Sequence, residues 1–181
     1  MLANKLTKEW QILVFILLIG LASRLIPHIP NATSMISLSL FIGYRLARGY
    51  AAGVTVLLVL VSNAALNFLY GYPMLGSWLL FMLSGLLAIS WCGRRLTPFN
   101  WGALGFYVTS GCLCYWLWTN LGVFWLSGYY PHTLSGFITC FYLALPFLGH
   151  SLLGNLIWAP MLFGIWQKRA WLNPNVLGEK T

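Results

Sequence analysis

The sequence predicts an all-α integral membrane protein, a bundle of six transmembrane helices that forms a single domain over residues 1–181. First, 60% of the residues are hydrophobic and only 7% are charged, whereas about a quarter of a soluble domain is charged. Second, several apolar runs approach the roughly 20 residues that cross a bilayer. Third, nearly all basic residues fall in segments that a six-span arrangement places on one side of the membrane.

The six spans are expected at residues 10–26, 32–50, 51–69, 78–92, 101–121 and 148–166. The first apolar run ends at Arg24 and the following Leu-Ile-Pro-His rather than at a small-residue cleavage site, which indicates a retained span. Asn31 or Thr33 is a possible N-cap of the second span. The YGYPMLGS segment turns the chain before the fourth span, and Pro160 predicts a kink in the sixth.

Residues 122–147 are expected to form an outer segment between the fifth and sixth spans. Their first half is too polar and too rich in Gly and Pro for a further clean span. The apolar second half, residues 134–145, predicts a short helix that lies at the interface or inside the protein.

The basic residues predict the orientation. One side of the six-span arrangement receives Lys5, Lys8, Arg45, Arg48, Arg94, Arg95, Lys168, Arg169 and Lys180. By the positive-inside rule that side is the cytoplasm, so both termini are expected inside. This topology accounts for the net charge of +8, and no nucleic-acid partner is expected.

The uncommon polar residues collect on the other, outer side. Asn63 and Asn67 are one helical turn apart and share a face. The other members of this cluster are Arg24, His28, Asn31, Asn120, His132, His150 and Asn155. Polar groups in a bilayer usually face the protein interior, and small-molecule sites are mostly apolar with a few polar groups. The cluster therefore predicts an outward-facing pocket with the aromatic loops as its walls.

Each of these residues also has a purely structural interpretation. Arg24 either extends to the outer headgroups or holds an anionic group of a ligand. Asn63 and Asn67 are also suited to hydrogen bonds between helices. His28 and His132 are either ordinary loop residues or metal ligands, and His150 either caps the sixth helix or faces the pocket.

The sequence argues against catalysis, a cofactor and a resident metal. The only acids, Glu9 and Glu179, lie in segments expected in the cytoplasm, so no span carries a carboxylate for acid–base chemistry or metal binding. There is no nucleotide-binding Walker motif and no Gly-x-Ser-x-Gly nucleophile elbow. The four cysteines show no zinc spacing.

Two blocks of the chain resemble a known family. They are SRLIPHIPNATSMISLSLFIGYRL at residues 23–46 and TNLGVFWLSGYYPHTLSGFITCFYLALPFLGHSLLGNL at residues 119–156. They resemble bacterial membrane proteins similar to the substrate-binding S components of energy-coupling-factor (ECF) vitamin transporters. The resemblance implies a six-helix protein of the bacterial inner membrane with an outward-facing vitamin pocket and cobalamin as the first candidate ligand. It places near the pocket Arg24, His28, Asn31, Asn120, Tyr130 and Pro131.

The resemblance also implies either an ECF T component with its ATPases as partner, or a solitary protein. The first span offers Gly20 and Ala22 two residues apart, not the four-residue spacing of small residues that close helix contact needs, which favours the solitary form. Asn63 and Asn155 stand where relatives often carry acids, which weakens a cation-binding role. For ligation of cobalt, the candidates are His28, His132 and Cys140, with Met74 as a weaker one.

The leading hypothesis is a substrate-binding uptake protein for a vitamin-like molecule, surrounded by membrane lipids. It uses Arg24, His28, Asn31, Asn63, Asn67, Asn120, Tyr130, His132 and His150. The second hypothesis is a non-transporting membrane subunit or scaffold whose outer loops meet a partner protein. The third is a membrane enzyme acting on a lipid or isoprenoid with a histidine base, and the scarcity of carboxylates disfavours it.

Overall fold

The computed structural model describes residues 2–25 and 31–172 of the chain. Six α-helices and one 3-10 helix make up this part: α1 (Leu2–Leu25), α2 (Met35–Arg45), α3 (Arg48–Tyr70), α4 (Trp78–Gly93), η1 (Arg94–Leu96), α5 (Trp101–Leu126) and α6 (Leu134–Leu172). No strand occurs among the described residues. The predicted all-α class is confirmed.

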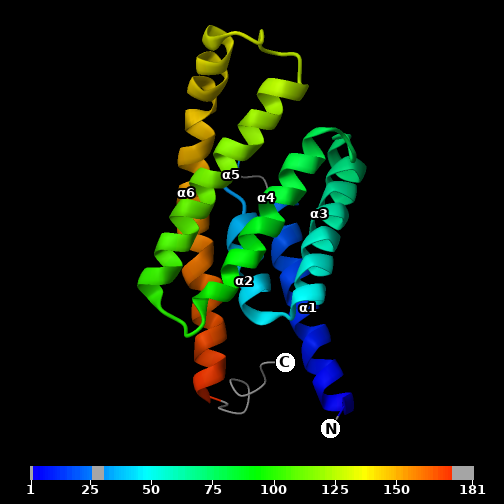
Figure 1. Cartoon of the computed structure of the whole chain (residues 1–181). Coiled ribbons are helices and arrows are strands. Elements are labelled where there is room, and N and C mark those ends of the chain that lie inside the picture. The colour runs from blue at the N-terminus through cyan, green and yellow to red at the C-terminus, as the bar shows by residue number, and fades with distance from the viewer. Residues whose placement is uncertain (1, 26–30, 173–181) are drawn as a thin grey trace.

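The helices form two outer pairs around a central pair. α1 packs along α3 on one side, α5 packs along α6 on the other, and α2 and α4 pack together between them (Figure 1). The start of α1 and the end of α6 lie at the same end of the molecule (Figure 1). This end, called the basal end below, also holds the turn between α2 and α3 and the η1 segment (Figure 1).

Three helices of the described chain are long and apolar enough to cross a membrane: Gly49–Tyr70, Trp78–Leu96 and Leu134–Lys168. The length and composition of these helices indicate a helical membrane protein. α5 has 26 residues but is not among the three, and its four tryptophans and two tyrosines lower its hydropathy. The described apolar stretches Val14–Leu25 and Met35–Arg45 are shorter. The described chain has six α-helices, as many as the expected spans, but only three of them are both long and apolar enough to cross a membrane.

α2 is much shorter than the span expected at residues 32–50. Its 11 residues extend about 16 Å, roughly half of the 30 Å hydrocarbon layer. Every residue from Met35 to Gly43 is buried, because the helix is enclosed by its neighbours on all sides. Its N-cap is Ser34, without a side-chain cap bond, and not Asn31 or Thr33 as the sequence suggested.

α6 is much longer than the span expected at residues 148–166. It continues for 39 residues through Pro146 and Pro160, and so it includes the second half of the segment expected outside at 122–147. Internal prolines are tolerated in membrane helices because neighbouring groups satisfy the backbone that they free. Here Trp116 Nε1 donates to the carbonyl oxygen of Ala144 at 2.9 Å, which ties the turn around Pro146 to α5. The prediction of a short separate helix at 134–145, at the interface or inside the protein, was wrong, because these residues form the first part of α6.

Candidate functional site

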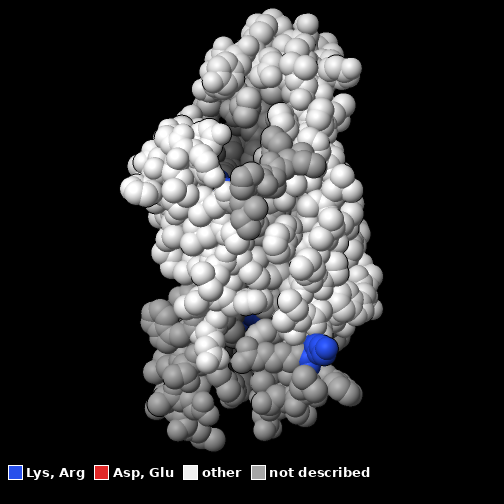
Figure 2. Space-filling model, turned by 180° about the vertical axis from the view of Figure 1, so that it is seen from behind, with Lys and Arg blue, Asp and Glu red and all other residues white. Residues whose placement is uncertain are grey.

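A cavity of about 410 Å³ lies between α1, α2, α4, α5 and α6. Because α2 is short and α1 ends at Leu25, neither helix fills the centre of the bundle in the half away from the basal end. Figure 2 shows a hollow in this half of the molecule, with basic atoms visible inside it. The polar residues that line the cavity are Arg24, Asn31, Thr33, Tyr115, Thr119, Asn120, Tyr130, Ser151 and Asn155.

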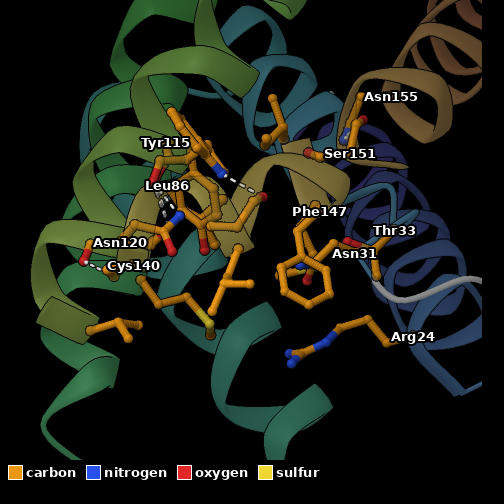
Figure 3. Close-up of a pocket in the computed structure, with 18 of the residues that line it drawn as sticks. Arg24, Asn31, Thr33, Leu86, Tyr115, Asn120, Cys140, Phe147, Ser151 and Asn155 are labelled. Atoms are coloured by element: carbon orange, nitrogen blue, oxygen red, sulfur yellow. Dashed lines mark hydrogen bonds between the residues drawn. The ribbon is translucent and has the colours of Figure 1, made fainter. Parts of the chain in front are cut away.

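Arg24 lies in the last turn of α1 and lines the cavity. Its Nη1 donates to Ser62 Oγ at 2.5 Å and to Asn63 Oδ1 at 2.8 Å, both on α3. Ser62 and Asn63 are buried, so one edge of the guanidinium is fixed against the interior of the protein. Figure 3 shows the side chain reaching into the space below Phe147.

A serine pair fixes the end of α1 against the start of α2. Ser23 Oγ and Ser34 Oγ are 2.7 Å apart, and the Ser34 backbone N–H donates to Ser23 Oγ at 3.3 Å. Both serines are buried. Two residues just before Ser34, Asn31 and Thr33, line the cavity. The backbone of Asn31 has a φ of +66°, a left-handed conformation that asparagine adopts more readily than most residues.

The far wall of the cavity is made by α5 and α6 rather than by loops. Trp116 of α5 is bonded to Ala144 of α6 at 2.9 Å, and Cys140 Sγ contacts the carbonyl oxygen of Asn120 at 3.8 Å. Asn120 Nδ2 donates to the Trp116 carbonyl oxygen at 2.8 Å. Figure 3 shows these bonds as dashed lines beside the cavity. They join the two helices along the wall.

Four of the predicted site residues line the cavity together: Arg24, Asn31, Asn120 and Tyr130. Asn63 acts behind them as a hydrogen-bond partner of Arg24. Asn67 is exposed and donates to the Tyr72 carbonyl oxygen at 2.8 Å, in the turn after α3. His28 lies outside the described residues.

Two further histidines and Pro131 are placed elsewhere. The His132 ring packs against the rings of Phe124 and Trp125, with centroids 5.3 and 5.2 Å apart. His150 is half-buried on α6 and is not among the residues that line the cavity. Pro131 is exposed in the connection between α5 and α6, and its carbonyl oxygen accepts from the Thr133 N–H at 2.8 Å.

Comparison with known proteins assigns the family but no activity. The model of one protein family, described as a family of unknown function (DUF6580), matches residues 4–174. The chain belongs to this family. No curated protein and no solved structure gives a significant match.

The structure of this DUF6580 protein gathers no metal centre among its described residues. No group of three or more His, Cys, Asp or Glu side chains is close enough there to hold a metal ion. Of the residues named for cobalt ligation, Cys140 lines the cavity, whereas His132 belongs to the aromatic cluster beside the α5–α6 connection.

Several residues of the DUF6580 cavity were missed by the sequence reasoning. On α5, Trp116 and Val123 lie one turn before and one turn after Asn120, so the helical period around Asn120 would have found them. Thr119, which directly precedes Asn120, also lines the cavity. On α6 the lining residues form one stripe along the helix: Cys140, Leu143, Ala144, Phe147, Ser151 and Asn155. The sequence reasoning had named Asn155 in the polar cluster and Cys140 for cobalt ligation, but it missed the other four. This stripe was hidden because the segment was expected to be divided between a loop and a span.

Proposed function

We propose that this DUF6580 protein is a membrane-embedded substrate-binding uptake protein whose cavity binds a vitamin-like small molecule. The observation that supports the proposal is the cavity itself. It combines apolar side chains from α2, α4, α5 and α6 with polar groups from the end of α1, the segment before α2, α5 and α6, which is the usual composition of a small-molecule site.

The proposal includes six membrane spans in the bacterial inner membrane, with both termini in the cytoplasm. The cavity then opens in the outer half of the bilayer. The basal end includes the basic residues Arg45, Arg94, Arg95 and Lys168, and the positive-inside rule assigns their side to the cytoplasm.

The volume of the cavity bears on the choice of ligand. About 410 Å³ is near the lower end of the range of roughly 300–1,000 Å³ for drug-sized ligands. Cobalamin, a corrin ring with an attached nucleotide, is large for a cavity of this volume and would require it to widen. The cavity as it stands favours a smaller vitamin, so both sizes belong in the binding test.

The solitary form of the protein is also favoured by packing. A side chain at Gly20 would collide with Leu58 Cδ1 of α3 and would lie 3.3 Å from Leu38 Cδ1 of α2. Gly20 is therefore used for contacts inside this chain. It does not provide a small-residue surface for a T component.

The test is a ligand search on purified protein in lipid nanodiscs. Bound compounds are extracted for mass spectrometry, and cobalamin and a panel of smaller vitamins are titrated calorimetrically. Thr119→Trp adds a large ring to the cavity lining, and Thr109→Trp on the exposed face of the same helix is the matched control. We expect saturable binding to the wild type and to Thr109→Trp, and a loss of at least tenfold in affinity in Thr119→Trp.

Equal affinity in both tryptophan variants would remove the cavity from the binding site. A protein that contains no compound, binds no vitamin and instead forms a stable complex with another membrane protein would contradict the uptake proposal. That result would favour the subunit or scaffold hypothesis.

A further inference from the structure

We propose that the cavity selects a ligand with a single negative charge, carried by an oxyanion group that binds to Arg24. The inference rests on the proposed function and adds to it the chemical class of the ligand. It divides that ligand into a monoanionic head, such as a carboxylate, and an apolar body.

The charge of Arg24 has no acidic partner among the described residues. Its hydrogen-bond partners on α3, Ser62 and Asn63, are neutral. The chain contains only two acids, Glu9 and Glu179. Glu9 precedes Arg24 by 15 residues on the continuous helix α1, which separates their backbones by about 22 Å. Glu179 lies outside the described residues.

The position of the guanidinium argues against extension to the headgroups. An arginine that extends to the membrane surface keeps its charged end in water or among headgroups. In this structure Nη1 is instead anchored on Ser62 and Asn63, which are 0% and 3% exposed. The guanidinium is therefore held inside the protein, at the edge of a cavity. A positive charge at such a place is stabilised by a bound anion, because its hydrogen bonds to two neutral side chains compensate only part of the cost of desolvation.

A second source of positive potential lies beside it. Met35 and Ile36, the first two residues of α2, line the same cavity. The N-terminus of a helix carries a partial positive charge and favours anions. Ser23 and Ser34 bond the end of α1, which carries Arg24, to the start of α2, and both Arg24 and this helix end line the one cavity.

The charge balance sets the number of negative charges on the ligand. Arg24 is the single charged residue among the described residues that line the cavity. A monoanion therefore leaves a neutral pair, whereas a dianionic phosphate monoester leaves a net negative charge in a low-dielectric site. Trp116, Phe147 and Leu86 line the same cavity, and their apolar surfaces suit an aromatic or aliphatic body.

The experiment compares probes that share a body and differ in charge. Indole-3-acetate and benzoate are each paired with their amides, and phenyl phosphate supplies a dianion. Binding is measured calorimetrically in phosphatidylcholine nanodiscs at fixed ionic strength, and native compounds are extracted for mass spectrometry. The variants are Arg24→Gln, which removes the charge, and Arg24→Lys, which retains it. The control is Arg95→Gln, at an exposed position of the basal end.

We expect wild type and Arg95→Gln to bind a carboxylate probe at least tenfold more tightly than its amide, and phenyl phosphate more weakly than the carboxylate. Arg24→Gln should lose this preference, and Arg24→Lys should recover part of it. The wild-type comparison of acid with amide tests the proposal even if Arg24→Gln fails to fold. Displacement of the probe by phosphatidylglycerol in the nanodisc would identify a lipid headgroup as the source of the monoanion.

Two results separate this inference from the proposed function. A neutral native ligand that binds equally to Arg24→Gln and is blocked by Thr119→Trp would overturn the anion inference and uphold the cavity as a binding site. A protein that retains no compound and binds neither probes nor vitamins would overturn both.

Discussion

At the residue scale, Asn155 joins α6 to the buried start of α2. Its Oδ1 accepts from the Ser37 backbone N–H at 2.9 Å and lies 2.8 Å from Ser37 Oγ. Its Nδ2 donates to the Ser151 carbonyl oxygen at 2.9 Å. Asn155 is 1% exposed, so water does not replace these bonds. One amide thus satisfies a backbone donor of α2 and fixes the floor of the cavity.

Asn155→Leu should destabilise the protein by about 1–3 kcal/mol, because it leaves the buried Ser37 N–H without its acceptor. The free energy of unfolding can be measured by titrating SDS into mixed micelles. Asn67→Leu is the control, since Asn67 is exposed and bonds only to a turn carbonyl, and it should change the stability by much less. Equal stability of Asn155→Leu and wild type would show that the Ser37 contact does not contribute.

Residue roles were only partly predictable from the sequence. Asn63 and Asn67 share a helical face, as their spacing indicates, and both donate to carbonyl oxygens of the turn after α3, those of Met74 and Tyr72. Only Asn63 also accepts a hydrogen bond from Arg24. The spacing sets the face of the helix, but the partner depends on which element packs there. α1 reaches Asn63 through Arg24, whereas Asn67 is one turn closer to the end of α3 and meets its own turn.

At the element scale, two glycines bring α2 and α4 into backbone contact. A side chain at Gly43 would collide with the Ser90 carbonyl oxygen, and one at Gly93 would collide with the Leu40 carbonyl oxygen. Small residues at a helix crossing permit this close approach in membrane proteins. The contact keeps the short helix α2 in the centre of the bundle, below the cavity.

Gly43→Ala and Gly93→Ala should each cost about 1–3 kcal/mol or more, because the obstructing atoms are backbone and cannot rotate away. The matched control is Gly53→Ala on α3, where an added Cβ meets nothing within 4 Å and the substitution should be neutral or slightly stabilising. SDS unfolding of all three variants tests this. A crossing variant as stable as Gly53→Ala would contradict the close contact.

Element lengths were the least predictable feature of the fold. An apolar run around a fully enclosed helix resembles the apolar run of a membrane span, so the hydropathy of residues 32–50 did not reveal that α2 has 11 residues. The same ambiguity concealed the length of α6, since Pro146 and nearby glycines usually mark a break. The helical class and the turn before α4 were predictable because neither depends on what surrounds each helix.

At the scale of the whole molecule, charge and cavity occupy opposite halves. Arg45, Arg94, Arg95 and Lys168 lie toward the basal end, and Arg24 is the one described basic residue at the cavity. Arg45 also lies over the Trp166 ring at 4.3 Å, a cation–π contact that fits an interfacial position. If the molecule crosses the membrane with its long axis along the bilayer normal, the two halves face different compartments.

This arrangement predicts the outcome of cysteine labelling in spheroplasts with a membrane-impermeant maleimide. In a variant with all four cysteines replaced, single cysteines are introduced at Tyr72 and Tyr129, exposed in the connections away from the basal end, and at Thr97 and Lys168, exposed at the basal end. The first two should react from outside, and the last two only after permeabilisation, because moving the clustered basic residues across the membrane is unfavourable.

A melting curve like that of the wild type is required for each variant. The reverse labelling pattern would invert the orientation and turn the cavity toward the cytoplasm, whereas labelling of Tyr72 and Tyr129 from opposite sides would contradict the six-span arrangement itself.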